Sequence, residues 1–180
     1  MGRVVKICAA IAALWCQNVM AAAGEAPGPA LEMRQLQLFQ GSWQCNGNQS
    51  DSVFGAGHAV QTAVSGKTDF DGHWMVVRFS ERRTKANDHP TDGVFYFGFD
   101  PAAKQFVANW IDNLGGWGRQ LSPGWQNDTL ILTGDYNTGG QKLGARDTFQ
   151  KKNDRSYVHR AELQKGDGTW VPLIEETCTK

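Results

Sequence analysis

Residues 93–112 read GVFYFGFDPAAKQFVANWID, two strongly apolar segments joined by a short turn. The segments, Gly93–Phe99 and Gln105–Asp112, are rich in the aromatic and β-branched residues that favour strands. Between them, Asp100–Lys104 carries a proline at the position that suits a type I turn. The stretch therefore predicts an antiparallel hairpin. Both faces of its strands carry large apolar side chains, as expected for strands that pack a core on one side and line a cavity on the other.

The same alternation of strand and turn extends in both directions from this hairpin. Turn signals recur at intervals of roughly eight to twelve residues, and Asp71-Gly72 predicts a two-residue type I′ turn. Leu31–Phe39 is the one segment with the apolar spacing of a helix. The predicted strands are Ser42–Asn48, Gly57–Phe70, His73–Arg82, Gly93–Phe99, Gln105–Asp112, Trp117–Trp125, Thr129–Tyr136, Leu143–Lys151, Ser156–Lys165 and Trp170–Cys178.

A meander of this many strands is expected to close into a barrel or to split into a sandwich. In an even-stranded up-and-down barrel, the first strand lies antiparallel beside the last. Cys45 lies in the first predicted strand and Cys178 in the last, so a bridge between them would join the closing seam. We therefore predict an all-β fold: an antiparallel up-and-down β-barrel of about ten strands with a short N-terminal helix.

The first 23 residues have the three regions of a secretory signal peptide. Arg3 and Lys6 supply a positive start, Ile7–Trp15 is apolar, and Ala21–Ala23 forms an A-x-A cleavage site. The apolar run is too short to cross a bilayer, which takes about 20 residues. We expect a periplasmic or secreted protein that is cleaved near Ala23 and does not insert into a membrane.

A lipoprotein signal that ends at Cys16 is the alternative, and the bulky Trp15 before this cysteine disfavours it.

The sequence predicts three parts of the chain: a signal peptide over residues 1–23, a flexible lead-in with the start of the helix over residues 24–35, and a barrel domain over residues 36–180.

Cleavage changes the charge and the cysteine count. The whole chain has 18 basic and 18 acidic residues, whereas residues 24–180 have 16 and 18, a formal net charge of −2 over 157 residues. This balance, without a basic run, excludes nucleic acid as the main partner. Only Cys45 and Cys178 remain, and two cysteines in an exported chain predict one disulfide rather than a metal site.

Residues 24–180 keep six tryptophans, a high number for this length. Small-ligand sites combine aromatic walls with a few polar groups that orient the ligand. Strand alternation places Arg78, Asp112 and His159 on faces that also carry aromatic residues, although the sequence does not fix which face points inward. No residue is predicted to be catalytic or to bind a metal. The candidate ligand-binding residues are Trp74, Arg78, Tyr96, Trp110, Asp112 and His159.

Several short motifs together resemble a bacterial, often exported, family of calycin-like, lipocalin-like barrels known mainly as a domain of unknown function. In lipocalins, a short helix leads into a Gly-x-Trp on the first strand, as Gly41-Ser42-Trp43 does here. The resemblance covers Leu36 to Cys178 and implies a barrel with a central cavity, without an established activity. The other motifs are Gly72-His73-Trp74, Phe97–Pro101, Trp110–Asn113, Arg146–Phe149 and Gly168-Thr169-Trp170.

The chain more distantly resembles nitrobindin-like haem barrels, which share the Gly-x-Trp opening. It departs from them in two places. The glycine-rich continuation after Trp43 is reduced to Gly47, and the last strand has no histidine where those proteins place their haem ligand. His159 lies one strand earlier, so haem bound through His159 is a minority alternative to the prediction of no cofactor.

Three hypotheses of function follow. The first is an exported barrel that binds a small hydrophobic or amphipathic molecule in its cavity. The second is an enzyme that uses a carboxylate with His159 or an arginine in that cavity, although the chain lacks the G-x-S-x-G, H-E-x-x-H and P-loop signatures. The third is a structural or interaction module with a packed barrel, in which the rim or a homodimer contact carries the function.

Overall fold

The structure is a computed structural model that describes residues 28–52 and 54–180. The predicted signal peptide and residues 24–27 of the predicted lead-in lie outside the described residues. Two short 3₁₀ helices are η1 (Leu31–Phe39) and η2 (Phe70–Gly72). The strands are β1 (Gly41–Gln49), β2 (His58–Asp69), β3 (Trp74–Glu81), β4 (Asp92–Asp100), β5 (Gln105–Asp112), β6 (Trp117–Ser122), β7 (Trp125–Gln126), β8 (Thr129–Thr138), β9 (Gln141–Asn153), β10 (Ser156–Gln164) and β11 (Trp170–Thr179).

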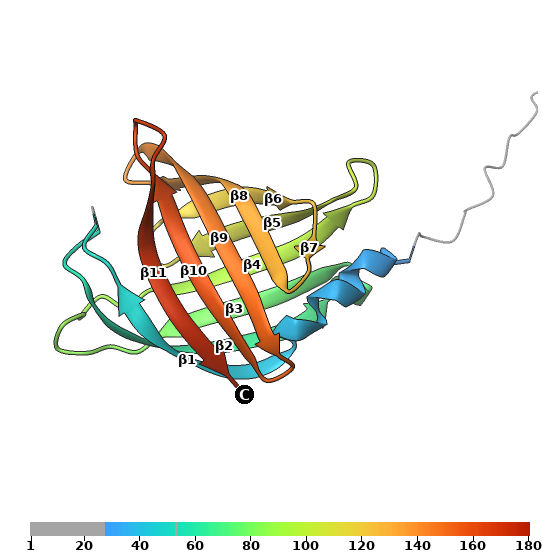
Figure 1. Cartoon of the computed structure of the whole chain (residues 1–180), viewed down its shortest axis with the longest axis horizontal. Coiled ribbons are helices and arrows are strands. Elements are labelled where there is room, and N and C mark those ends of the chain that lie inside the picture. Colours follow the sequence, from blue (N-terminus) through green and yellow to red (C-terminus); the bar gives the residue numbers. More distant parts are fainter. Residues whose placement is uncertain (1–27, 53) are drawn as a thin grey trace, which may run out of the picture.

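The strands form one closed antiparallel barrel (Figure 1). Each long strand pairs with its neighbours along the chain, β1 pairs with β11, and β6 pairs with β8. The two-residue β7 lies outside this ring and pairs only with the start of β8. Ten strands therefore close the barrel, which confirms the predicted fold class. Within the described residues, no helix has the length and apolar character needed to cross a bilayer.

The disulfide joins the two ends of the sheet. Cys45 on β1 and Cys178 on β11 are direct partners in the strand register, and their sulfurs are bonded. Both residues are buried. The predicted bridge is therefore present at the closing seam. Beside it, Gly47 faces Glu176, and a methyl group on Gly47 would come within 2.6 Å of the Cβ atom of Glu176. A glycine is required for this close approach of the two strands.

The turn between β2 and β3 is longer than predicted. Asp69 pairs with Trp74, so four residues connect the strands instead of two. The carboxylate of Asp69 accepts a hydrogen bond from the amide of Phe70, and the amide of His73 donates to the carbonyl of Phe70. Phe70, Asp71 and Gly72 all have positive φ. The Asp-Gly signal marked the right place, but these local bonds select a wider turn.

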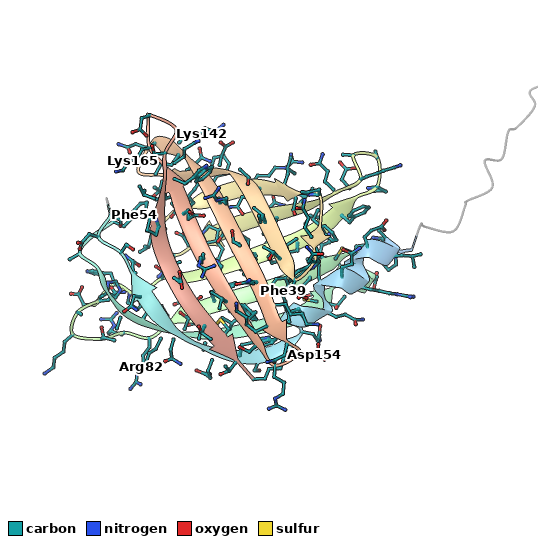
Figure 2. The ribbon with its side chains drawn as sticks, viewed as in Figure 1. Phe39, Phe54, Arg82, Lys142, Asp154 and Lys165 are labelled. Atoms are coloured by element: carbon teal, nitrogen blue, oxygen red, sulfur yellow. A yellow bond between two sulfur atoms is a disulfide. The ribbon has the colours of Figure 1, made fainter. Side chains whose placement is uncertain are left out.

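Buried hydrophobic side chains fill one half of the barrel interior. Helix η1 lies across this end of the barrel, and its Leu36 and Phe39 are completely buried (Figure 1). The ring of Phe39 stacks on Phe97 with centroids 5.3 Å apart and meets Phe149 edge-on at 4.9 Å. Burial of one such side chain contributes roughly 1.5–3 kcal/mol to folding. Figure 2 places Phe39 at this end, far from Lys142 and Lys165 at the turns of the opposite end.

Candidate functional site

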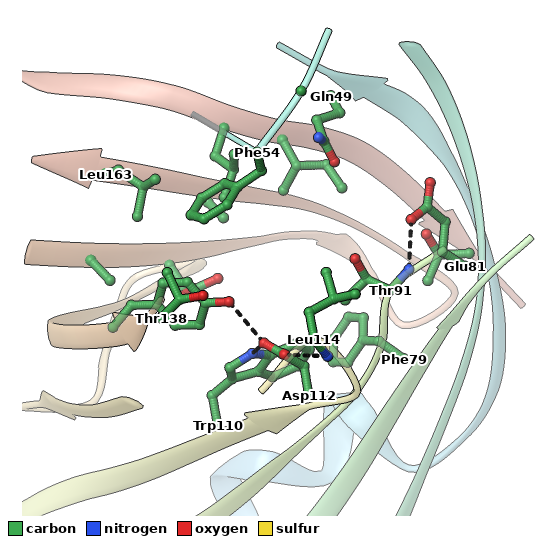
Figure 3. Close-up of a pocket in the computed structure, with 18 of the residues that line it drawn as sticks. Gln49, Phe54, Phe79, Glu81, Thr91, Trp110, Asp112, Leu114, Thr138 and Leu163 are labelled. Atoms are coloured by element: carbon green, nitrogen blue, oxygen red, sulfur yellow. Dashed lines mark hydrogen bonds between the residues drawn. The ribbon is translucent and has the colours of Figure 1, made fainter. Parts of the chain in front are cut away.

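The other half of the barrel contains a cavity of about 510 Å³. Its walls include the aromatic rings of Phe79, Phe95 and Trp110. No residue of η1 lines it, so the cavity lies away from the end that the helix covers. Its mouth is bordered by residues of the 49–58 and 86–91 loops, which include Phe54 and Thr91 (Figure 3).

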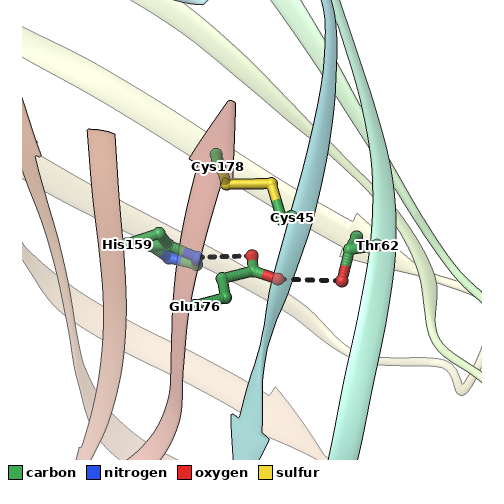
Figure 4. The surroundings of a disulfide bond; sticks show 5 residues. All are labelled: Cys45, Thr62, His159, Glu176 and Cys178. Atoms are coloured by element: carbon green, nitrogen blue, oxygen red, sulfur yellow. Dashed lines mark hydrogen bonds and ion pairs between the residues drawn. A yellow bond between two sulfur atoms is a disulfide. The ribbon is translucent and has the colours of Figure 1, made fainter. Parts of the chain in front are cut away.

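Five polar side chains form a continuous hydrogen-bonded cluster inside the barrel, called here the polar cluster. Thr62 donates to Glu176 (2.8 Å), and Glu176 lies 3.1 Å from Nδ1 of His159 (Figure 4). Nε2 of His159 lies 2.7 Å from Asp147, and Gln120 donates to the second oxygen of Asp147 at 2.6 Å. All five residues are more than nine-tenths buried, and all line the cavity.

Strand register assembles the polar cluster from five strands. His159 on β10 is the direct partner of Glu176 on β11 and of Phe149 on β9. Asp147 lies two residues before Phe149, so it points to the same face of the sheet. The ring of Phe149 lies parallel to the imidazole, with centroids 4.6 Å apart and planes 8° apart. The imidazole is therefore held by a carboxylate at each nitrogen and by an aromatic ring on one face.

The surroundings of His159 decide its charge. Burial alone would lower its pKa, because a buried imidazolium loses its hydration. The hydrogen bonds and negative charges of Asp147 and Glu176 outweigh this effect and raise the pKa of His159 to about 9. The imidazole is therefore protonated at neutral pH and donates from both nitrogens.

Asp112 binds several groups in the cavity wall through its carboxylate. One of its oxygens accepts from the indole of Trp110 (2.8 Å) and the hydroxyl of Tyr136 (2.9 Å), as Figure 3 shows for the indole. The other accepts from the amides of Leu114 and Gly116. Burial and the nearby charge of Asp112 raise the pKa of Tyr136 to about 12. Asp112 thus positions Trp110, and its acceptor sites are filled by the protein.

Glu81 fixes one loop at the mouth. Its carboxylate lies 3.1 Å from Nε2 of His58 and accepts from the side chain of Asn87 and the amide of Thr91. The segment between β3 and β4, which contains residues 82–91, is thereby tied to the barrel wall.

The structure brings together three of the six predicted ligand residues. Trp110, Asp112 and His159 line the cavity. Trp74, Arg78 and Tyr96 do not: on β3 the buried residues are Met75, Val77 and Phe79, so the alternate positions face outward. Tyr96 pairs with Val76 and shares that outer face. The sequence left the inward face open, and for these three residues the structure places the side chains outside the cavity, because successive residues of a strand point to opposite faces.

Sequence reasoning did not identify Thr62, Gln120, Asp147 and Glu176 as site residues. Polar residues within strands usually face solvent, so their presence in these strands gave no signal of a buried site. One signal could have found Glu176. It lies two residues before Cys178 and shares its face, and a cysteine bridged across the seam is buried.

The polar cluster does not fit a haem iron. Both ring nitrogens of His159 already lie within hydrogen-bond distance of carboxylates, so neither is free to bind iron. Cys45, Cys178 and Glu176 also lie close together, but the disulfide removes the thiolates that a metal would need.

Comparison with known proteins agrees with this architecture. The crystal structure of Rv2717c from M. tuberculosis matches with a TM-score of 0.63 at 9% sequence identity, over 84% of this chain and 98% of that one. At this identity the likeness shows the fold alone. No curated protein matches the chain. A family model described as "Protein of unknown function (DUF1579)" matches residues 28–180. The match spans most of the chain, which therefore belongs to the DUF1579 family.

Proposed function

We propose that the protein is an exported β-barrel that binds a small, partly apolar molecule inside the barrel. The observation that carries this proposal is the cavity of about 510 Å³ beside the solid half of the barrel. Ligand sites of small molecules commonly have volumes of roughly 300–1,000 Å³ and mostly apolar walls with a few polar groups. The rings of Phe79, Phe95 and Trp110 are such walls, and the polar cluster provides the orienting groups.

Export is the second part of the proposal. It rests on the signal-like residues 1–23 and on the disulfide, because disulfides persist in oxidising compartments. Fractionation of cells that make the full chain tests it. We expect a protein cleaved near Ala23 in the periplasm or the medium. Uncleaved protein in the cytosol would contradict this part of the proposal and leave ligand binding untouched.

Tryptophan fluorescence tests ligand binding. Neutral lipophilic compounds such as 4-phenylbutan-1-ol and menthol are titrated into the purified protein with its disulfide intact. We expect a saturable change in emission, because Trp110 lines the cavity. Trp110→Phe should remove most of this change, whereas Trp117→Phe should leave it intact, since Trp117 is 57% exposed on β6. Failure of the whole panel to bind, checked by calorimetry, would contradict the proposal.

An enzyme is the second candidate function. The observation in its favour is that His159 and two carboxylates meet inside the cavity within hydrogen-bond distance. A protonated imidazole has no free lone pair and cannot accept a proton, so in this candidate His159 acts as a general acid after one of its two hydrogen bonds opens. Turnover of a bound probe that His159→Gln abolishes would favour it.

An interaction module is the third candidate. Ile111 on β5 and Trp117 on β6 are register partners, and both are exposed. Such a pair supports a homodimer contact on the outer face of the barrel. It leaves the cavity unexplained, which is why ligand binding is preferred.

A further inference from the structure

The described residues that line the cavity carry acidic groups without lysine or arginine. Two of these acids lie beside cations outside the lining: Glu162 binds Arg146 at 2.7 Å, and Asp135 binds Lys142 at 2.9 Å. Clefts lined by charges of one sign concentrate ligands of the opposite sign. The acidic lining residues are Glu81, Asp88, Asp112, Asp135, Asp147, Glu162 and Glu176.

The polar cluster lacks one positive charge. It holds two carboxylates, Asp147 and Glu176, and one imidazolium, His159, so its formal charge is −1. All three side chains are at least nine-tenths buried. A buried charge without a counter-charge is costly, and a cation that entered the cluster would remove this cost.

The polar cluster also lacks one hydrogen-bond donor. Gln120 is 4% exposed, points inward from β6 and donates from Nε2 to Asp147. Its Oε1 atom has no partner within the described part of the chain. Rotation of the amide would not help, because Oε1 would then face a carboxylate oxygen. A buried acceptor without a donor typically costs about 1–3 kcal/mol.

Aromatic rings form the wall next to this cluster. Phe79 lies 5.7 Å from the imidazole of His159, and Trp110 lies 6.0 Å from Phe79, measured between ring centroids. Phe95 contacts Trp110 at 4.7 Å. Such rings bury the apolar part of a ligand, and their faces attract cations.

We propose that the cavity selects small organic amines, with the ammonium group at the polar cluster between Asp147, Glu176 and Gln120. The apolar part of the amine lies against Phe79, Phe95 and Trp110. The ammonium supplies both the missing positive charge and the missing N–H donor. A carboxylate or phosphate ligand would meet acidic groups and no lysine or arginine among the described lining residues. This inference rests on the proposed ligand-binding function and deepens it.

Three probes test the inference: 4-phenylbutylamine, 4-phenylbutan-1-ol and 4-phenylbutanoic acid. They share a phenyl ring on a four-carbon chain and differ in the polar group at its end. Their affinities are measured by calorimetry at pH 7 in a buffer with a chelator, so that divalent cations do not compete. We expect the amine to bind at least about tenfold more tightly than the alcohol, because charge-assisted hydrogen bonds are roughly twice as strong as neutral ones. The acid should bind most weakly.

Two neighbouring glutamates on β11 provide a matched pair of variants. Glu176→Gln removes a charge from the polar cluster, and Glu175→Gln removes one from the outer face, where Glu175 binds Arg160. Glu176→Gln should reduce the preference for the amine over the alcohol to near unity. Glu175→Gln should leave the preference unchanged. A folded Glu176→Gln protein that keeps the full preference would overturn the inference.

One further probe needs only the unaltered protein, in case Glu176→Gln does not fold. The trimethylammonium derivative of 4-phenylbutylamine keeps the positive charge but has no N–H to donate to Gln120. We expect it to bind at least about fivefold more weakly than the primary amine, consistent with loss of about 1 kcal/mol. Equal affinity of the two cations would overturn the assignment of the ammonium to Gln120.

The outcomes separate this inference from the proposed function. An alcohol or acid that binds as tightly as the amine overturns selection of amines and leaves ligand binding in place. Absence of binding by all three probes also overturns selection of amines. The proposed function itself fails only if the neutral panel described above fails to bind as well.

Discussion

His159 and Glu176 face one another across β10 and β11 as direct register partners, with Nδ1 of the imidazole 3.1 Å from a carboxylate oxygen. On the other side of the ring, Asp147 lies 2.7 Å from Nε2. A histidine with a carboxylate at each nitrogen is a buried cation inside the barrel. Its protonation therefore couples the stability of the fold to pH.

Stability should decrease as pH rises from about 6.5 to about 9. The folded state raises the pKa of His159 from 6.5 to about 9, so its stabilising contribution is complete below the unfolded value and is lost as pH rises through the folded value. A shift of this size corresponds to roughly 3 kcal/mol. Urea unfolding at pH 6, 7.5 and 9 measures the free energy of unfolding.

Two histidine variants provide the controls for this dependence. His159→Gln should remove most of the slope between pH 6.5 and 9. His89→Gln should not change it, because the side chain of His89 is 84% exposed. Tyr136 and Tyr157 do not interfere, since burial raises the pKa values of both hydroxyls well above this range. An unchanged slope in His159→Gln would show that other groups control it.

Loss of the disulfide should destabilise the barrel by about 2–5 kcal/mol. Cys45 and Cys178 are 133 residues apart in the sequence, so their bond constrains the unfolded chain strongly. Thermal unfolding of Cys45→Ala/Cys178→Ala measures the effect. Reducing agent should lower the melting temperature of the unaltered protein and leave that of the double variant unchanged. Equal melting temperatures of oxidised and reduced protein would contradict the prediction.

Gly93→Ala should displace Trp110 and weaken ligand binding. A Cβ atom at Gly93 would overlap the indole of Trp110, which Phe79, Phe95 and Asp112 hold in place. Overpacking of this kind costs about 1–3 kcal/mol. Trp110 emission and the affinity for 4-phenylbutan-1-ol are the readouts.

Gly98→Ala is the matched control for that substitution. Gly98 lies on the same strand, but its added Cβ would approach Trp74 on the outside of the barrel, at 2.9 Å. Probe affinity should therefore stay unchanged in Gly98→Ala. If both substitutions reduce affinity equally, the effect is general loss of stability rather than displacement of Trp110.

Most of the fold could be predicted from the sequence because its signals are local. Turn residues and the two-residue period mark each strand, and Cys45 and Cys178 indicate the closing seam. The site was harder to predict because it depends on which face points inward. For β3, the sequence shows apolar residues on both faces, and the inner face belongs to Met75, Val77 and Phe79 rather than to Trp74.

The polar cluster depends on long-range register. Thr62 and Glu176 are 114 residues apart, and no local pattern indicates that they meet. His159 was predicted as a candidate because it shares a strand face with Tyr157. The pairing of β10 with β9 and β11 brings Asp147 and Glu176 to His159. The sequence around each of these carboxylates is that of an ordinary strand and does not indicate the contact.

Glu81→Ala should free the loop at the mouth of the cavity. Glu81 accepts from Asn87 and Thr91, so its loss leaves residues 82–91 without their side-chain attachment to β3. Arg82, Arg83 and Lys85 then become better sites for trypsin, because proteolysis requires local unfolding. We expect cleavage there to be at least several-fold faster. Asp88→Asn is the control, since Asp88 lies in the same loop and its side chain is 80% exposed, with the ring of His89 3.7 Å away. Equal cleavage rates in the two variants would show that Glu81 does not hold the loop.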